Sequence, residues 1–275
     1  MTRTVKQITF GGVFVVVVAF VVFGIYRWTR PTLTCFDKIQ NQGEEGVDCG
    51  KVCGNTCLES LLPIKVLDSR LFKIRDINNQ MDYDAFFRVS NPNIQFGSGN
   101  VEYELKILDG QGNILVAKNN SFYILPGQTK YVYEPLLKTN SSAGSVELKI
   151  TKVDWQKLQG VFGQQVKLIV RSKDYFLNNK PGVFSRVTGD VFNSSDFDLD
   201  RVDVVVVIFK NNVPIGVNRT DLRTLTAQSD RFFEVDWVSP ISEMPDRIDV
   251  EPTTNVFQDS NFIRRYGVPE KFQQP

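Results

Sequence analysis

Two stretches of the chain, about 101 residues apart, follow the same pattern of residue types. The first runs from Arg88 to Tyr133 and the second from Asp190 to Val235. Five pairs of positions match at offsets of 100 to 102 residues. The pairs are Asn91 with Asn193, Val101 with Val202, Leu108 with Phe209, Leu125 with Leu225, and Val132 with Phe233. This period is too long for a solenoid repeat and predicts a duplicated domain.

The apolar residues of each copy recur with the spacing of β-strands. The stretch 202–209 (VDVVVVIF) places apolar side chains on both faces of an extended strand, which predicts a strand buried at the centre of the protein. The stretch 233–237 (FEVDW) alternates apolar and acidic residues, so one face is expected to meet a core. Asp109–Gly112 and Lys210–Asn212 separate apolar runs and are typical of hairpin turns.

These patterns predict a mainly β protein with two tandem Ig-like β-sandwich domains, at residues 59–158 and 159–258. The Cys and Trp pattern of true immunoglobulin domains is missing, so packing must hold each sandwich together. Asn91 and Asn193 are interpreted as structural, because asparagine at a strand end bonds to neighbouring backbone. The polar C-terminal tail, residues 259–275, is expected to be loose.

Residues 187–217 of the second copy resemble the FxLYD domain family. The positions that fit the family pattern are Gly189, Asn193, Val202, Val204 and Phe209. The family usually has Tyr-Asp after its valine-rich strand, whereas this chain has Phe209 and Lys210. The first copy resembles, more distantly, the water-stress (WHy) type of late-embryogenesis-abundant domain. The resemblance implies Ig-like sandwiches and brings no catalytic residues with it.

An uncharged apolar run of 19 residues, Ile8 to Tyr26, lies near the N-terminus. As a helix it would extend about 28 Å, close to the thickness of the hydrocarbon core of a bilayer. Tyr26 and Trp28 suit the aromatic belt at a membrane interface. A cleaved signal peptide and a buried core helix are the alternatives, but the run is long for either. We therefore interpret residues 1–31 as a cytoplasmic stub and a transmembrane anchor in contact with the lipid bilayer.

Basic residues flank the apolar run on both sides, so charge does not decide its orientation. The four cysteines of the chain lie together just after the run. Clustered cysteines suit an oxidising compartment better than a cytosol. We expect a single-pass protein of the cell membrane, with a cytoplasmic N-terminus and extracytoplasmic C-terminal domains.

Residues 32–58 are expected to form a small segment held by disulfides. The four cysteines are Cys35, Cys49, Cys53 and Cys57. Structural zinc sites often use two C-x2-4-C pairs, whereas here only the later three cysteines are close-spaced. The C-x2-C motif of thioredoxin-like redox centres is absent. Two disulfides are therefore predicted, and three pairings remain open. Closing a loop of about 15 residues removes about 3 kcal/mol of unfolded-state entropy in the simplest treatment.

Four oxygen-bearing side chains lie between the first two cysteines: Asp37, Asn41, Glu44 and Asp48. Oxygen ligands of this kind bind Ca²⁺, so these residues form a calcium-site hypothesis, and Ca²⁺ is the one cofactor considered. Their spacing does not match the EF-hand loop. The alternative is a solvated polar loop in which Asp and Asn side chains cap turns.

The segment from Cys35 to Cys53 resembles a short motif of bacterial surface proteins, C-x-D-G-x-x-N-x-x-E-x-x-V-D-C-G-G-x-C. The positions on the motif are Cys35, Asp37, Asn41, Glu44, Val47, Asp48, Cys49, Gly50 and Cys53. Lys38 and Lys51 replace its usual glycines. The resemblance implies a location at the bacterial cell surface and implies no activity.

Composition argues against several classes of function. The 32 basic and 31 acidic residues nearly balance, which disfavours nucleic acid as a partner. The chain has no histidine, so the Ser-His-Asp and Cys-His mechanisms are excluded. We do not expect an enzyme. The less favoured alternative is a carboxylate-based hydrolase using the acidic run Asp196, Asp198, Asp200 and Asp203.

The sequence thus predicts a membrane-anchored extracytoplasmic binding or structural protein that displays two β-sandwich modules at the bacterial cell surface. The alternative is an accessory subunit of a membrane or envelope assembly. In both cases the expected partner is a protein or a component of the cell envelope, and the contacts are expected on loops at the ends of the sandwiches.

Overall fold

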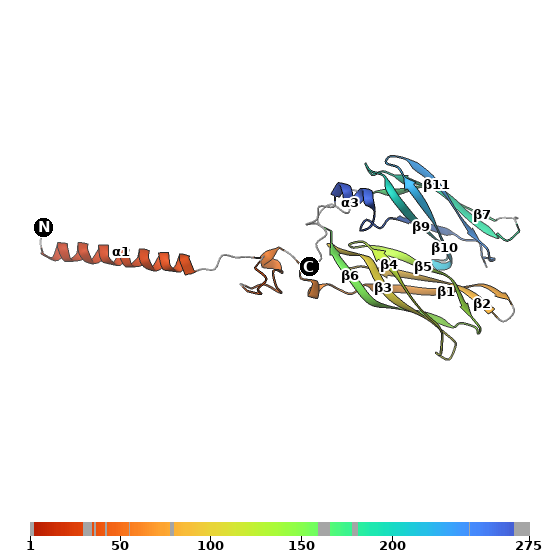
Figure 1. Ribbon diagram of the computed structural model, residues 1–275, viewed down its shortest axis with the longest axis horizontal. Helices are drawn as coiled ribbons and strands as arrows, with labels where there is room; N and C mark the ends of the chain where they lie inside the picture. Colours follow the sequence, from red (N-terminus) through yellow and green to blue (C-terminus); the bar gives the residue numbers. More distant parts are fainter. Residues whose placement is uncertain are drawn as a thin grey trace. The chain divides into compact units, whose positions relative to one another are not determined.

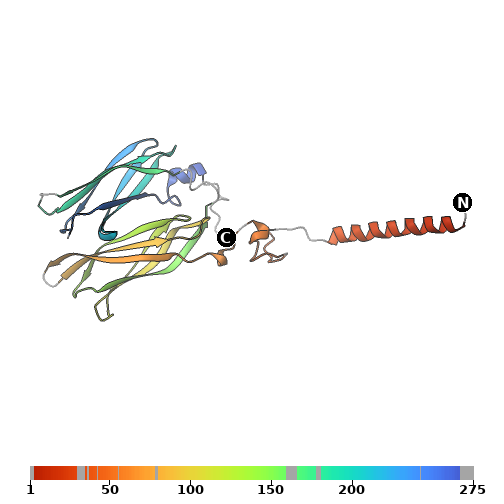
Figure 2. The same cartoon turned by 180° about the vertical axis from the view of Figure 1, so that it is seen from behind.

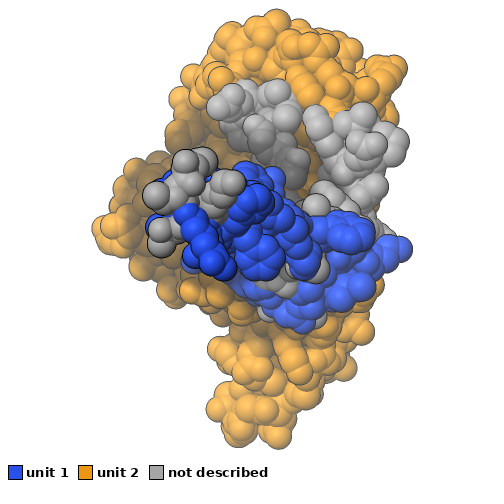
Figure 3. Space-filling view, turned by 90° about the vertical axis from the view of Figure 1, so that its left-hand side faces the viewer, with its two compact units in different colours: residues 1–61 blue, residues 62–275 orange. Residues whose placement is uncertain are grey.

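The computed structural model describes residues 3–29, 35, 37–41, 43–54, 56–77, 80–158, 166–177, 181–241 and 243–266. The chain forms two compact units, Met1–Leu61 and Leu62–Pro275, which are coloured separately in Figure 3. The predicted junction between the sandwiches at residue 159 and the tail beyond Tyr266 lie outside the described residues.

The first unit begins with the helix α1, Arg3–Thr29, shown in red in Figure 1. The predicted span Ile8 to Tyr26 lies within it, and its apolar side chains face outward instead of forming a core. Residues Gln7–Trp28 make this helix long and apolar enough to cross a membrane. Its 27 residues correspond to a length of about 40 Å. The helical part of the predicted single-pass anchor is therefore confirmed.

The remainder of the first unit holds two short 3₁₀ helices, η1 (Lys51–Cys53) and η2 (Leu58–Ser60), and the four cysteines. Gly54 ends η1 in a left-handed conformation, with a φ of 66° that glycine adopts without steric cost. Glu44 is the one charged residue that is buried among the described residues of this unit.

The second unit is built from β-strands, as the sequence predicts. Its strands in the first half are β1 (Lys65–Ile77), β2 (Gln80–Ser90), β3 (Phe96–Leu108), β4 (Ile114–Ile124), β5 (Thr129–Thr139) and β6 (Ser145–Lys157). Those in the second half are β7 (Leu168–Leu177), β8 (Ser185–Asn193), β9 (Leu199–Lys210), β10 (Val213–Leu225), β11 (Asp230–Trp237) and β12 (Arg247–Thr253). All of their pairings are antiparallel.

The two halves repeat one strand order. In the first half, β2 lies between β1 and β5, and β3 lies between β4 and β6. In the second half, β8 lies between β7 and β11, and β9 lies between β10 and β12. Each strand of the first half therefore corresponds to the strand six places later in the chain. We call β1–β6 the first sandwich and β7–β12 the second sandwich.

Each sandwich has its own apolar core between its two sheets. In the first, β2 contributes Phe87 and Val89, and β3 contributes Leu105 and Ile107. In the second, the core includes one face of β9, namely Val202, Val204, Val206 and Ile208, all of them inaccessible to solvent. The alternation of side chains along an extended strand explains why every second residue reaches these cores.

The opposite face of β9 packs against the first sandwich. Val205, Val207 and Phe209 form a separate apolar cluster with Phe86 of β2 and Tyr133 of β5. Figures 1 and 2 show the two sandwiches stacked face to face, with β5 and β10 side by side. The strand 202–209 is therefore buried on both faces, and its predicted central position is confirmed.

The C-terminal tail is not loose throughout, because residues Ser260–Tyr266 form the helix α3. Phe262 is 1% exposed and packs with Phe197 and Tyr266 at the end of the second sandwich. Asp259 caps the helix by accepting a hydrogen bond from the backbone N–H of Phe262 at 2.9 Å. The expectation of a loose tail is wrong for this part because a single aromatic side chain finds a place in the core.

Candidate binding cleft

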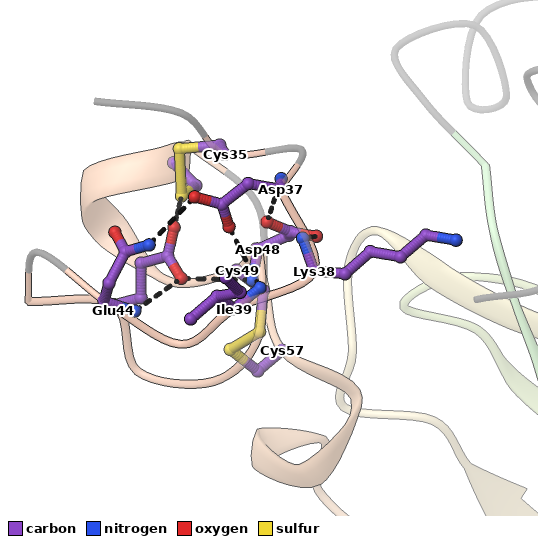
Figure 4. The surroundings of a disulfide bond; sticks show 10 residues. Cys35, Asp37, Lys38, Ile39, Glu44, Asp48, Cys49 and Cys57 are labelled. Atoms are coloured by element: carbon purple, nitrogen blue, oxygen red, sulfur yellow. Dashed lines mark hydrogen bonds between the residues drawn. A yellow bond between two sulfur atoms is a disulfide. The ribbon is translucent and has the colours of Figure 1, made fainter. Parts of the chain in front are cut away.

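The structure pairs the predicted cysteines as Cys35 with Cys53 and Cys49 with Cys57, so both predicted disulfides are present (Figure 4). Glu44 lies beside the first bond, with Oε1 3.1 Å from Sγ of Cys53. A bonded sulfur carries no proton and is not a thiolate, so this is a packing contact. Cys35, Glu44 and Cys53 come within 4.8 Å of one another, but their sulfurs are not metal ligands while they are oxidised.

The predicted calcium residues also lie together, and the oxygens of the three carboxylates among them accept hydrogen bonds from the backbone of the same segment. Both oxygens of Asp48 are used, by the N–H groups of Asp37 at 3.0 Å and Lys38 at 2.9 Å. Glu44 Oε2 accepts from the N–H of Asn41 at 3.3 Å and of Asp48 at 3.2 Å. These carboxylates therefore hold the turns of a segment that has almost no apolar core.

The side chains of Asp37 and Asn41 complete this network. Asp37, labelled in Figure 4 with Ile39, accepts from the N–H of Ile39 at 2.9 Å. It also accepts from the amide of Asn41 at 2.9 Å. Oδ1 of Asn41 is buried without a hydrogen-bond partner in the described part of the chain. The arrangement accounts for the three carboxylates as structural acceptors and for Asn41 as a donor to Asp37, and calcium binding stays a prediction.

The acidic run of β9 and the loop before it also has structural partners. Asp196 pairs with Arg265 of α3, and Asp198 accepts from the N–H of Ala227 at 2.8 Å. Asp200 accepts from the N–H and hydroxyl of Ser260 at the start of α3, at 2.8 and 2.6 Å. Three of the four carboxylates thus hold α3 and a neighbouring turn, a role that sequence reasoning missed.

The fourth carboxylate, Asp203, lines a cleft of about 380 Å³ between the two sandwiches. The first sandwich contributes side chains from β3, β4 and β5, and the second contributes side chains from β9, β10 and β12 and from the segment before α3. This volume lies in the range of small-molecule sites. The sequence could not indicate it, because its walls come from residues as far apart in the chain as Tyr103 and Asp259.

One wall of the cleft is organised around Glu134, which is 3% exposed. Its carboxylate accepts hydrogen bonds from the hydroxyl of Tyr103, the amide of Asn120 at 2.6 Å and the amine of Lys118 at 2.6 Å. Burial raises the pKa of Tyr103 well above the usual tyrosine range, and the bond to Glu134 acts in the same direction. Glu134 is therefore fully engaged by donors of its own sandwich.

Lys130 lies at the base of the cleft and is 6% exposed. Its amine donates to the backbone carbonyl of Tyr123 at 3.0 Å and lies 3.5 Å from the centre of the Tyr123 ring. Burial lowers the pKa of Lys130, and burial raises the pKa of Glu251 on the facing strand. Oε1 of Glu251 is buried and has no hydrogen-bond partner among the residues that the structure describes.

Two tyrosines connect the sandwiches across the base of the cleft. Tyr123 donates to Asp203 at 3.1 Å, and its hydroxyl lies 2.8 Å from the hydroxyl of Thr253. The N–H of Tyr131 donates to Glu251 at 3.0 Å, and its hydroxyl donates to Asp249 at 3.0 Å. Burial and the neighbouring charge of Asp249 raise the pKa of Tyr131 to about 12. These bonds make the floor of the cleft part of the contact between the sandwiches.

Arg219 of β10 lines the cleft with an exposed side chain. Its guanidinium has no ion pair and no hydrogen bond with any residue that the structure describes. Burial raises the pKa values of Tyr103 and Tyr133, and the positive charge of Arg219 acts in the opposite direction by lowering them. The same charge lowers the pKa of Lys130, in the same direction as burial. The cleft therefore holds an arginine of the second sandwich, unpaired among the described residues, whose charge acts on side chains of the first sandwich.

No protein-family model matches the chain, and no curated protein matches it either.

Proposed function

We propose that this protein is a membrane-anchored extracytoplasmic binding protein that displays two β-sandwich modules at the bacterial cell surface and uses the cleft between them as its contact site. The observation that carries the proposal is the cleft, a concave polar site between two sheets that pack face to face. The same chain has an N-terminal helix that is apolar and long enough to cross a membrane. Sites built on packed strands hold their side chains in place more firmly than sites on loops.

The disulfide segment supports the extracytoplasmic side of the proposal. Two disulfides within residues 35–57 persist in an oxidising compartment and are rare in a cytosol. The resemblance of this segment to a motif of bacterial surface proteins, and of the sandwiches to FxLYD and WHy-type Ig-like domains, supports the same reading.

Binding is favoured over catalysis by the state of the acidic side chains. The carboxylate of Glu134 accepts hydrogen bonds from three side chains of the protein. The carboxylate of Asp203 accepts from Tyr123 and Arg201. The carboxylate of Asp200 accepts from the start of α3. A catalytic acid or base needs a hydrogen-bonding position that is open to substrate. These carboxylates are instead occupied by the protein, which suits a site that recognises a ligand without transforming it.

The experiment that tests the proposal is protease treatment of intact cells that produce the full-length protein. We expect loss of the fragments that contain the sandwiches, with α1 protected by the membrane. A cytoplasmic membrane protein serves as the control for cell integrity. Digestion of the sandwiches only after lysis would place them in the cytoplasm and overturn the proposal.

A further inference from the structure

We propose that Arg219 is the anchor of an anion-binding subsite in the cleft, and that the ligand is a sugar carrying a carboxylate or phosphate group. This inference rests on the proposed binding function and names the class of ligand for the same site. In the cleft, the carboxylates already accept hydrogen bonds from the protein, whereas donor groups of Arg219 and Lys130 remain open.

The carboxylates that line the cleft already accept hydrogen bonds from the protein. Both oxygens of Glu134 and both oxygens of Asp203 accept hydrogen bonds from side chains of the protein. Asp200 and Asp259 accept from groups at the start of α3. A ligand that relied on donating to these carboxylates would have to displace an internal bond, which favours a ligand that brings acceptors instead.

The open groups are donors. Arg219 has a guanidinium with five N–H groups and no partner among the described residues. The amine of Lys130, deeper in the cleft, has three N–H groups and one hydrogen bond, to the carbonyl of Tyr123. A planar guanidinium matches carboxylate and phosphate groups in a two-pronged geometry, so the cleft is complementary to an anion.

Among the described residues, two of the four carboxylates that line the cleft are paired with cations, and the other two, Asp200 and Asp259, accept hydrogen bonds from the segment that begins α3. Asp203 is paired with Arg201 at 3.0 Å, and Glu134 with Lys118 at 2.6 Å. These pairs neutralise each other locally, while the charge of Arg219 acts on the buried cation Lys130. An anionic group bound at Arg219 would relieve this repulsion between like charges.

The size and lining of the cleft suggest that a small sugar carries the anion. The volume of about 380 Å³ is larger than a bare ion needs and suits a ligand of one or two sugar rings. Phe122 offers a half-buried ring beside Tyr103, with ring centres 5.6 Å apart. Ser121 and Gln258 are exposed polar side chains that also line the cleft and could bond to hydroxyl groups.

The test uses the full-length protein in lipid nanodiscs and isothermal titration with four probes: glucuronic acid, glucose 6-phosphate, glucose and inorganic phosphate. We expect the two anionic sugars to bind and glucose to bind at least about tenfold more weakly, since a charge-assisted bond contributes roughly 1.5–3 kcal/mol. Equal binding of glucose would overturn the anion subsite. Inorganic phosphate that binds as tightly as glucose 6-phosphate would overturn the sugar part.

Two substitutions on the same strand separate the site from general charge effects. Arg219→Gln should weaken the binding of the anionic sugars by about tenfold or more, and Arg219→Lys should restore only part of it, because lysine lacks the planar fork. Arg223→Gln is the matched control, since Arg223 is 82% exposed and does not line the cleft. Unchanged binding in Arg219→Gln, with melting behaviour like the parent, contradicts the proposal.

The binding result is independent of cellular location. Surface-exposed sandwiches that bind none of the four probes would leave the proposed function in place and remove only this ligand class. Sandwiches found in the cytoplasm would remove the proposed function, whatever the titration shows.

Discussion

Gly189 of β8 lies directly opposite Phe233 of β11, and the ring of Phe233 fills the space above the glycine. The corresponding cross-strand pair of the first sandwich is Phe87 of β2 with Val132 of β5. The aromatic ring has thus moved from one strand to the other between the two copies. Each of the two pairs combines a large side chain with a smaller partner, but the large one lies on opposite strands in the two sandwiches. Such a combination fits the dense packing of a protein core.

We therefore expect Gly189→Ala to destabilise the second sandwich. A Cβ at Gly189 would lie 2.3 Å from the carbonyl oxygen of Ser172 and 2.8 Å from the Phe233 ring. Overpacking of this kind costs about 1–3 kcal/mol. Chemical denaturation of Gly189→Ala, Phe233→Val and the double variant measures the coupling. A double variant that loses the full sum of the two single losses would contradict a direct steric conflict.

Asn91 and Asn193 are expected to have equal structural roles. Each donates from its side chain to backbone carbonyls, Phe96 and Leu125 for Asn91, and Phe197, Leu225 and Thr226 for Asn193. The distances range from 2.7 to 3.2 Å. Alanine at either position should cost roughly 1–3 kcal/mol or more, because buried carbonyls lose their donor.

Thermal melting of the two alanine variants measures this loss. Asn140→Ala serves as the control, since Asn140 is exposed at the end of β5. A loss in one variant only would show that the duplicated network is not equivalent in the two sandwiches.

The disulfide pairing is open to a direct check. Peptide mapping without reduction should recover Cys35 linked to Cys53 and Cys49 linked to Cys57. Replacing Cys35 and Cys53 together by serine should destabilise the segment by about 3 kcal/mol, because the bond closes a loop with a sequence separation of 18 residues. Hydrogen exchange over residues 43–54 is the readout. Any other linkage, or free thiols in protein from an oxidising compartment, would contradict the structure.

The stability of the second unit should decrease as pH rises above about 4.5. Burial raises the folded-state pKa of Glu251 above its ordinary value of 4.5. Such a group contributes stability that is fully present below the unfolded-state pKa and is lost as pH rises through the folded-state pKa. Burial also raises the pKa values of Asp84 and Asp259, which adds an effect of the same sign.

Thermal melting between about pH 5 and pH 7 measures this dependence. Glu251→Gln should show a shallower decrease than the parent, because glutamine does not titrate. In this range Lys130 keeps its charge in both the folded and the unfolded chain, although burial lowers its pKa. Identical slopes for the two proteins would show that Glu251 does not carry the effect.

The helix α3 is expected to depend on one side chain. Phe262→Ala removes the ring that packs on Phe197 and Tyr266, and a buried Phe to Ala change costs about 3–5 kcal/mol. Hydrogen exchange over residues 255–266 should rise strongly, whereas the exposed substitution Arg264→Ala should leave it unchanged. Equal protection in both variants would mean that Asp200 and Asp259 hold the helix without the ring.

Several features could be derived from the residues alone because they depend on local spacing. The alternation of 233–237, the apolar faces of 202–209 and the repeated anchors indicate strands, a central strand and a duplication. The length and composition of Ile8 to Tyr26 indicate a helix able to cross a membrane. Four cysteines, whose spacing along the chain differs from that of common zinc motifs, indicate two disulfides.

The tertiary structure alone decided which cysteines pair, because three pairings satisfy the same spacing. It alone brought α3 onto the acidic run, since Ser260 and Asp200 lie 60 positions apart and nothing local links them. It also placed Arg219 opposite Tyr103 and Glu134 in one cleft. Periodicity specifies which face of a strand is apolar, but the partner of that face is chosen by the free energy of packing over the whole chain.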